Sequence, residues 1–138
     1  MQANLLCLDY GTQWTGIAIA TTPLAEPFKT IPTNQVITTI PKLVENYNIN
    51  ALIIGISEGQ MAQTTRQFAI KLKEIINLPI YFHDETLTSQ EARRKLAQAK
   101  AKKQKREAKT DHYAATAILQ DFIDLNTHLD TLPEPDKI

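Results

Sequence analysis

The segment that best predicts the architecture of this chain spans residues 4–21 and reads NLLCLDYGTQWTGIAIAT. Apolar side chains fall on both sides of its first half, up to Asp9, which is typical of a strand that is covered on both faces. After the break at Gly11, isoleucine alternates with glycine and alanine, which predicts a second strand with one face of small residues. Because the link between the two halves is short, we expect an antiparallel hairpin whose first strand is central in a sheet.

Beyond this hairpin the hydrophobic pattern alternates between strand and helix. A brief third strand at 28–31, set between two prolines, fits the edge of a sheet. Further elements are expected as a helix at 38–47, a strand at 51–54, a helix at 63–76, a strand at 80–83, a helix starting near Thr88 and a last helix at 111–125. Alternating strands and helices favour parallel pairing with right-handed crossovers, so the chain is predicted to be α/β. We expect one domain over residues 1–138, with a loose tail from about residue 127.

The charges are unevenly distributed, although 15 basic and 15 acidic residues give a net charge of +0. Residues 93–109 contain nine lysines and arginines and a single acid, Glu107. A cluster of cations neutralises phosphates and releases their counterions, so this segment predicts a nucleic-acid partner. We expect the contacts to come from one turn residue and from the second part of the basic segment: Thr12, Lys100, Lys102, Lys103, Lys105, Arg106 and Lys109.

The single cysteine, Cys7, lies inside the first strand, which excludes an intrachain disulfide and a cysteine metal cluster. No apolar stretch approaches the roughly 20 residues that span a bilayer, and no basic start leads into a long apolar run. We therefore expect a soluble cytoplasmic protein with no membrane partner.

Three acidic residues that are far apart in the sequence are expected at one rim of the sheet. Asp9 ends the first strand and Glu85 follows the strand at 80–83, and open α/β sheets bind their ligands at the carboxyl ends of strands. Asp111 opens the last helix and shares a face with apolar residues four, seven and eleven positions later, so its carboxylate should point toward the sheet. Three carboxylates in one place repel one another unless a cation compensates their charge, and oxygen ligands suit Mg²⁺ or Mn²⁺. Such ions can activate a water molecule and stabilise the leaving oxygen of a phosphodiester, which predicts a nuclease.

Each of these acids also has an ordinary structural explanation. Aspartate is common in turns, such as the one after Asp9. Glu85 and Asp111 both fall near the start of a predicted helix, where negative charge is favourable. The functional interpretation is strongest for Asp9, because a charge that ends a strand buried on both faces is costly without a purpose.

Three motifs stand in order along nearly the whole chain. They are LDYGT at 8–12 with GIA at 16–18, DETLTS at 84–89 with EA at 91–92, and Asp111 followed by AA at 114–115 and ILQ at 118–120. Together they resemble the YqgF family of pre-16S ribosomal RNA nucleases, which are related to Holliday junction resolvases. The resemblance implies a ribonuclease H-like fold with a five-stranded mixed sheet, the first three strands antiparallel and helices on both faces. It also implies that Asp9, Glu85 and Asp111 are the catalytic residues and hold the metal.

The resemblance implies a function together with two alternatives. The main expectation is a nuclease in ribosome biogenesis that acts on structured RNA, in 5′-end maturation of the 16S ribosomal RNA precursor, as a monomer or weak homodimer. The first alternative is cleavage of branched DNA, as in a Holliday junction resolvase. The second is a catalytically weakened nucleic-acid-binding protein, because the chain has Gln13 and Trp14 where the family usually has a basic pair, and Thr86 where it has arginine.

Overall fold

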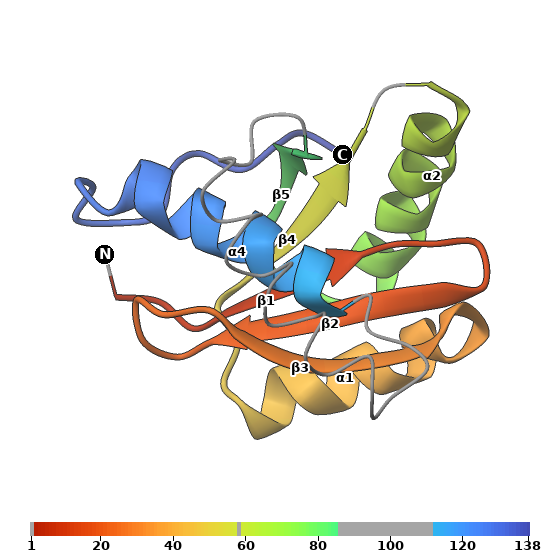
Figure 1. Ribbon diagram of the computed structural model, residues 1–138, viewed down its shortest axis with the longest axis horizontal. Coiled ribbons are helices and arrows are strands. Elements are labelled where there is room, and N and C mark those ends of the chain that lie inside the picture. Colours follow the sequence, from red (N-terminus) through yellow and green to blue (C-terminus); the bar gives the residue numbers. More distant parts are fainter. Residues whose placement is uncertain (1, 58, 86–111) are drawn as a thin grey trace.

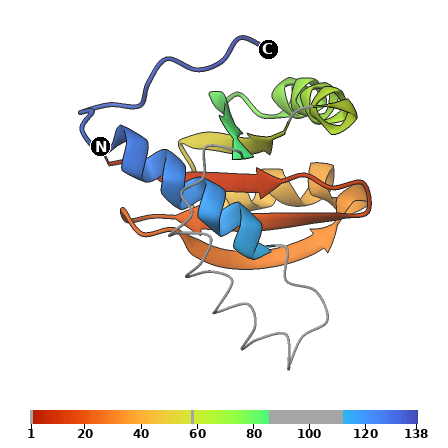
Figure 2. The same cartoon turned by 45° about the horizontal axis from the view of Figure 1, so that its top comes forward.

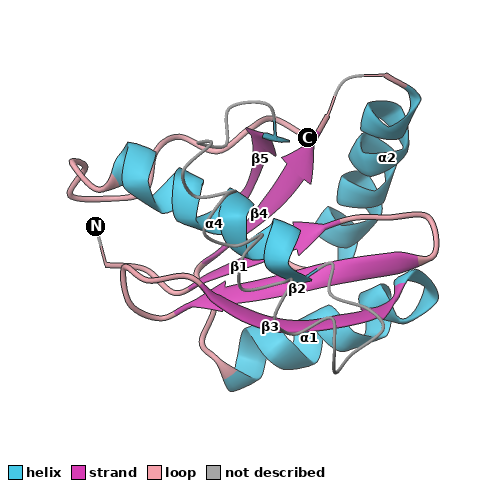
Figure 3. Cartoon of the chain, in the orientation of Figure 1, coloured by secondary structure: helices cyan, strands magenta, loops and turns pink. Residues whose placement is uncertain are grey.

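The computed structural model describes residues 2–57, 59–85 and 112–138 (Figure 1). Five strands form one sheet in the order β3-β2-β1-β4-β5, which Figure 3 shows in magenta. The strands are β1 (Leu5–Asp9), β2 (Trp14–Ala20), β3 (Glu26–Pro32), β4 (Ala51–Ile56) and β5 (Ile80–Asp84), and the helices are α1 (Val36–Asn46), α2 (Gln60–Ile75) and α4 (His112–Asn126), with a short 3-10 turn η1 (Thr33–Gln35) before α1.

The sheet is mixed, as predicted. β1 pairs with β2, and β2 pairs with β3, in antiparallel orientation. β1 also pairs with β4, and β4 with β5, in parallel orientation. The first three strands are therefore antiparallel, β1 is central, and both features of the predicted fold class are confirmed.

The third strand is longer than the sequence predicted. β3 spans Glu26–Pro32 and not only 28–31, and both flanking prolines, Pro27 and Pro32, lie in register with residues of β2. Proline has no N–H to donate, but a strand at the edge of a sheet pairs on one side only. Because β3 is such an edge strand, it can contain both prolines. The predicted helix near Thr88 lies outside the described residues.

Helices cover both faces of the sheet (Figure 2). On one face, leucines and isoleucines of the strands pack against α1 and α2, through residues such as Ile40 and Leu72. On the other face, the small residues Ala18 and Ala20 of β2 lie in the cluster that contains Ile118 and Phe122 of α4. The face of small residues predicted for the second strand is thus the face that α4 covers.

The segment after α4 forms no helix or strand but returns to the edge strand β5 (Figure 1). The hydroxyl of Tyr81 donates a hydrogen bond of 2.6 Å to the carbonyl oxygen of Pro133. The backbone N–H of Phe82 donates to Oδ2 of Asp136 at 2.7 Å. The tail that the sequence predicted to be loose therefore has two polar attachments to the outermost strand.

Among the described helices, none combines the length with the apolar character that a membrane crossing requires.

Candidate active site

Asp9 and Glu85 lie at the same edge of the sheet, where the parallel strands β1, β4 and β5 have their carboxyl ends. Asp9 is the last residue of β1, and Glu85 directly follows the last residue of β5. Side chains two residues apart on a strand share a face. Asp9 is therefore on the face of Cys7, which packs in the cluster beneath α4. The structure brings these two predicted site residues to one edge.

Gly55, close to the end of β4, leaves room for the side chain of Glu85. A Cβ atom on Gly55 would lie 3.1 Å from Oε1 of Glu85 and 2.5 Å from Cδ1 of Ile118 in α4. The carboxylate of Glu85 therefore lies over β4, the strand between β5 and β1. Extending the parallel register of β1 and β4 by one residue places Asp9 beside Gly55. Glu85 thus reaches across the sheet toward Asp9.

Gly55 is not among the site residues predicted from the sequence. The available signal was its position, since Gly55 is a glycine inside the apolar strand Ala51–Ile56. A glycine within a strand often marks the close approach of another group. Here that group is the side chain of Glu85.

The thiol of Cys7 is sensitive to the charge at this edge. Burial is the largest cause that raises the pKa of Cys7 well above its usual value, and the carboxylates of Asp9 and then Glu85 raise it further. Electrostatic interactions weaken with distance, so both carboxylates must lie near this one side chain. The edge beneath α4 is consequently a negative environment, which attracts cations.

The turn that follows Asp9 is held from two sides. The hydroxyl of Thr33 donates a 2.7 Å hydrogen bond to the carbonyl oxygen of Gly11, and the N–H of Thr33 donates to the carbonyl oxygen of Gln13 at 2.9 Å. The ring of Tyr10 stacks on Phe68 of α2, with ring centroids 4.2 Å apart. These contacts hold the backbone that directly follows Asp9.

Of the remaining predicted site residues, the structure describes Thr12 alone. Thr12 is exposed in the turn after β1. Asp111 lies outside the described residues, and α4 begins at the next residue, His112. Also outside the described residues are the basic side chains Lys100, Lys102, Lys103, Lys105, Arg106 and Lys109. Within the part of the chain that the structure describes, no three His, Cys, Asp or Glu side chains gather as a metal site, so this part supplies the two carboxylates.

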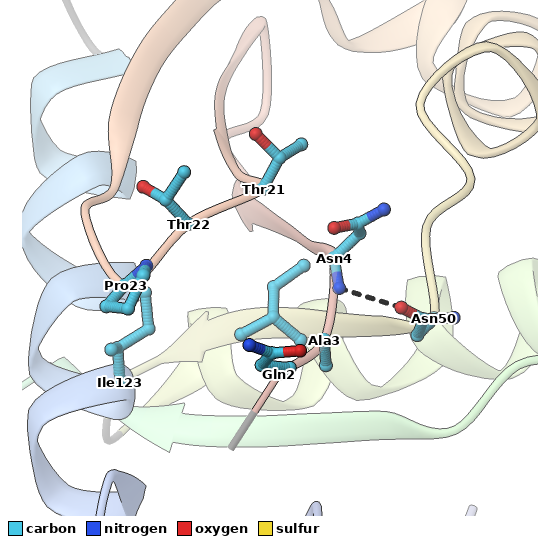
Figure 4. A pocket seen from close by; sticks show the side chains of 9 residues that line it. Gln2, Ala3, Asn4, Thr21, Thr22, Pro23, Asn50 and Ile123 are labelled. Atoms are coloured by element: carbon cyan, nitrogen blue, oxygen red, sulfur yellow. Dashed lines mark hydrogen bonds between the residues drawn. The ribbon is translucent and has the colours of Figure 1, made fainter.

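A cavity of about 510 Å³ lies at the opposite end of the sheet (Figure 4). It is lined by residues that precede β1 and β4, residues that follow β2, and Ile123 of α4. Two asparagine side chains that line it form hydrogen bonds within the protein. Oδ1 of Asn50 accepts from the backbone N–H of Asn4, and Nδ2 of Asn4 donates to the carbonyl oxygen of Tyr47. None of the described residues that line the cavity is an aspartate or glutamate, and the cavity is separate from the edge that carries Asp9.

A family model described as "RuvX: Holliday junction resolvase" matches residues 3–125. The chain belongs to the RuvX family. A protein of Roseiflexus sp. (strain RS-1) named "Putative pre-16S rRNA nuclease" is 35% identical over 132 residues, covering 88% of this chain and 94% of that protein. A protein of the same name from Bacillus cereus (strain B4264) is 32% identical over 134 residues, covering 88% of this chain and 98% of its own. The resemblance inferred from the three motifs is thereby confirmed.

The fold of this RuvX-family chain is also found in a solved structure. The RuvC protein of T. thermophilus, solved in complex with a Holliday junction substrate, superposes with a TM-score of 0.65 at 12% sequence identity. The superposition covers 91% of this chain and 96% of that chain. It confirms the predicted ribonuclease H-like fold.

Proposed function

We propose that this chain is a nuclease that depends on a divalent metal ion and hydrolyses phosphodiester bonds at the 5′ end of the 16S ribosomal RNA precursor. The observation that carries the proposal is the position of Asp9 and Glu85. They come from strands that do not pair with each other, yet Glu85 extends over Gly55 toward Asp9 on the face beneath α4. The relatives from Roseiflexus and Bacillus cereus, which align over most of their length, are named as nucleases of the 16S ribosomal RNA precursor. Their names support this RNA as the substrate.

The residues present fit Mg²⁺ or Mn²⁺. The donors are carboxylate oxygens, which hard cations prefer, and Mg²⁺ in phosphate-processing sites commonly has one or two protein carboxylates with water and substrate phosphate as further ligands. Asp9 and Glu85 would hold the ion together with Asp111. When bound, the metal supplies activation of a water molecule and stabilisation of the leaving oxygen.

The chain's own residues orient these ligands and the substrate. Asp9 and Glu85 are both half-buried. Asp9 is the last residue of β1 and Glu85 directly follows β5, so the sheet positions both residues. Thr12, which is exposed in the turn after β1, would donate its hydroxyl to a substrate phosphate. Lys100, Lys102, Lys103, Lys105, Arg106 and Lys109 would neutralise further phosphates, which gives affinity with little sequence specificity.

Cleavage of branched DNA is the second candidate, and the description of the matched family favours it. The same metal-assisted displacement serves both polymers, because the reacting phosphodiester is identical. The two functions therefore differ in how the substrate is held and not in the carboxylates. Binding without turnover is the third candidate.

The test uses the purified chain, its Asp9→Asn and Glu85→Gln variants, and a matched control, Asp84→Asn. Asp84 adjoins Glu85 but occupies the alternate strand position, and so the opposite face. Each protein is incubated with a 16S precursor carrying its 5′ extension and with a four-way DNA junction, in Mn²⁺ or in EDTA. We expect the wild type and Asp84→Asn to cleave the RNA in Mn²⁺ only. The two site variants should be slower by at least about a hundredfold, since even the partners of metal ligands typically contribute 10–100-fold.

Each alternative gives a distinct result. Equal cleavage by the wild type and both site variants would point to a contaminating nuclease and refute the assignment. Faster cleavage of the junction than of the RNA would favour the resolvase. Binding of either nucleic acid with no cleavage in Mn²⁺ would identify a binding protein.

A further inference from the structure

A buried polar pair joins β5 to α4 next to the candidate active site. Nε2 of His83 lies 2.8 Å from Oδ2 of Asp121, and the two side chains are 8% and 9% exposed. We propose that this pair is a positioning device that sets the distance between Glu85 and the start of α4. The inference rests on the proposed function and deepens it, because it assigns two further residues to the same site.

The pair connects a strand and a helix that each pack mainly against other elements. α4 packs mainly over β1, β2 and β3. β5 is at the other edge of the sheet, and among the described residues it pairs only with β4. Figure 1 shows α4 crossing the sheet in front of β1 and β2, with β5 beyond β4. The contact between His83 and Asp121 therefore ties the outermost strand to a helix that is centred elsewhere.

The hydrogen bond between His83 and Asp121 is accompanied by further contacts between β5 and α4. A carboxylate only accepts hydrogen bonds, so Nε2–H of His83 donates to Asp121. The ring of His83 also meets Phe122 of α4 edge to face, with centroids 6.0 Å apart. Tyr81, two residues earlier on β5, contacts the same Phe122 ring at 5.3 Å. Two successive inward-facing residues of β5 are thus held by two successive residues of α4.

The same two elements carry the candidate site. His83 is two residues before Glu85. Asp121 is one helical turn after Ile118, the residue that flanks Glu85 above Gly55. α4 itself begins directly after Asp111. Any change in the spacing of β5 and α4 consequently moves Glu85 relative to the first turn of α4.

A stabilising role alone does not account for a polar pair at this position. Replacing a buried ion pair by apolar residues of similar volume is often neutral or stabilising. An apolar contact, however, tolerates sliding, whereas a hydrogen bond of 2.8 Å fixes one atom against another. Metal ligands must be held to within about 0.5 Å, which is the precision that such a bond supplies.

The experiment separates positioning from stability with three variants. His83→Phe with Asp121→Leu replaces both partners by apolar groups, so the thermal midpoint should stay close to that of the wild type. Asp121→Asn keeps an acceptor for Nε2–H. The control, Gln120→Leu, changes the residue before Asp121 and removes the hydrogen bonds that the Gln120 amide accepts from the N–H of Ala25 and donates to the carbonyl oxygen of Pro23. Circular dichroism first confirms that each variant is folded.

The readouts are Mn²⁺ affinity, from the loss of the free Mn²⁺ signal in electron paramagnetic resonance, and kcat and KM for the precursor RNA. We expect the double variant to bind Mn²⁺ about tenfold more weakly and to lose kcat with little change in KM, as for other residues that orient metal ligands. Asp121→Asn should remain near the wild type. Gln120→Leu should lower the thermal midpoint without changing Mn²⁺ affinity.

Unchanged Mn²⁺ affinity and kcat in the double variant would overturn the positioning role while leaving the proposed function intact. A double variant that fails to fold would show that the pair is needed for the fold itself and would refute a role confined to positioning. A loss of Mn²⁺ affinity in the control Gln120→Leu equal to that in the double variant would refute positioning as well. A wild type that binds no Mn²⁺ and cleaves neither substrate would refute the proposed function and this inference together.

Discussion

Replacing Gly55 by alanine tests the position of Glu85 with the smallest possible change. The added Cβ would lie 2.5 Å from Cδ1 of Ile118 and 3.1 Å from Oε1 of Glu85. Carbon atoms in contact are about 3.5–4.0 Å apart, so the methyl group of Ile118 must move by about 1 Å. The Glu85 oxygen, at 3.1 Å, must move by roughly a few tenths of an ångström. The substitution therefore disturbs both the packing of α4 and the carboxylate.

The two effects have different magnitudes and different assays. Overpacking of a core typically costs about 1–3 kcal/mol, which urea unfolding measures as a lower midpoint at unchanged slope. A displacement of about 1 Å in an active site can cost on the order of a hundredfold in rate. We therefore expect Gly55→Ala to be folded in dilute buffer and to cleave precursor RNA in Mn²⁺ between about ten- and a hundredfold more slowly than the wild type.

A second substitution separates the two causes. Ile118→Val removes the Cδ1 atom that meets the new methyl group, although by itself it should cost about 0.5–1.5 kcal/mol. In the double variant the unfolding free energy should be higher than the sum of the single effects predicts, because the steric conflict is relieved. The rate should stay low, because the alanine still crowds Glu85.

Two results would refute this reasoning. Wild-type activity in folded Gly55→Ala would mean that the observed position of Glu85 over β4 is not required for cleavage. Full recovery of the rate in the double variant would assign the loss to Ile118 and α4, and not to the carboxylate.

Three further predictions concern the edge strand β5 and the buried thiol of Cys7. Removing residues 131–138 exposes the backbone of the edge strand at Phe82, so the truncated chain should self-associate as its concentration rises in analytical ultracentrifugation. Burial and then Asp136 raise the pKa of Tyr81, so Asp136→Asn should lower the phenol's midpoint in an absorbance titration without returning it to the unperturbed value. Because the folded-state pKa is the higher one, the stability linked to Tyr81 is complete below the unfolded value of about 10 and is lost as pH rises through the folded value. Cys7, fully buried and with a raised pKa, should react with a thiol reagent only at the rate of unfolding, and prompt reaction of the native protein would contradict its placement.

The sequence predicted those parts of the fold that depend on local periodicity. The alternation within residues 4–21 identified the central hairpin, and the end of the first strand located Asp9 at the edge of the sheet. Prolines are a less reliable guide, because Pro27 and Pro32 predict the limits of a strand that in fact contains both. The strand can contain these prolines because β3 lies at the edge of the sheet, and that position is a property of the assembled sheet.

The contacts within the site could not be predicted in the same way. A periodic pattern gives the face of a strand on which a residue lies but not its register against other elements. The contact of Glu85 with Gly55 requires the order of β4 and β5, and the hydrogen bond of His83 with Asp121 joins residues 38 positions apart. Nothing in the residues around His83 distinguishes it from an ordinary polar residue at the end of a strand.

The two faces of the sheet differ in a way that bears on function. Toward α1 and α2 the central strands present large side chains such as Leu8 and Ile17, whose burial supplies much of the driving force for folding. Toward α4, where Leu5 and Ile53 also pack, some positions are small, as in Ala18 and at Gly55, so the helix and Glu85 can approach the backbone closely there. Truncating a large residue on the first face should therefore lower stability while leaving metal affinity unchanged in the molecules that remain folded. Enlarging a small residue on the second face should lower metal affinity as well as stability, because there the added atoms displace both α4 and the groups that carry the carboxylates.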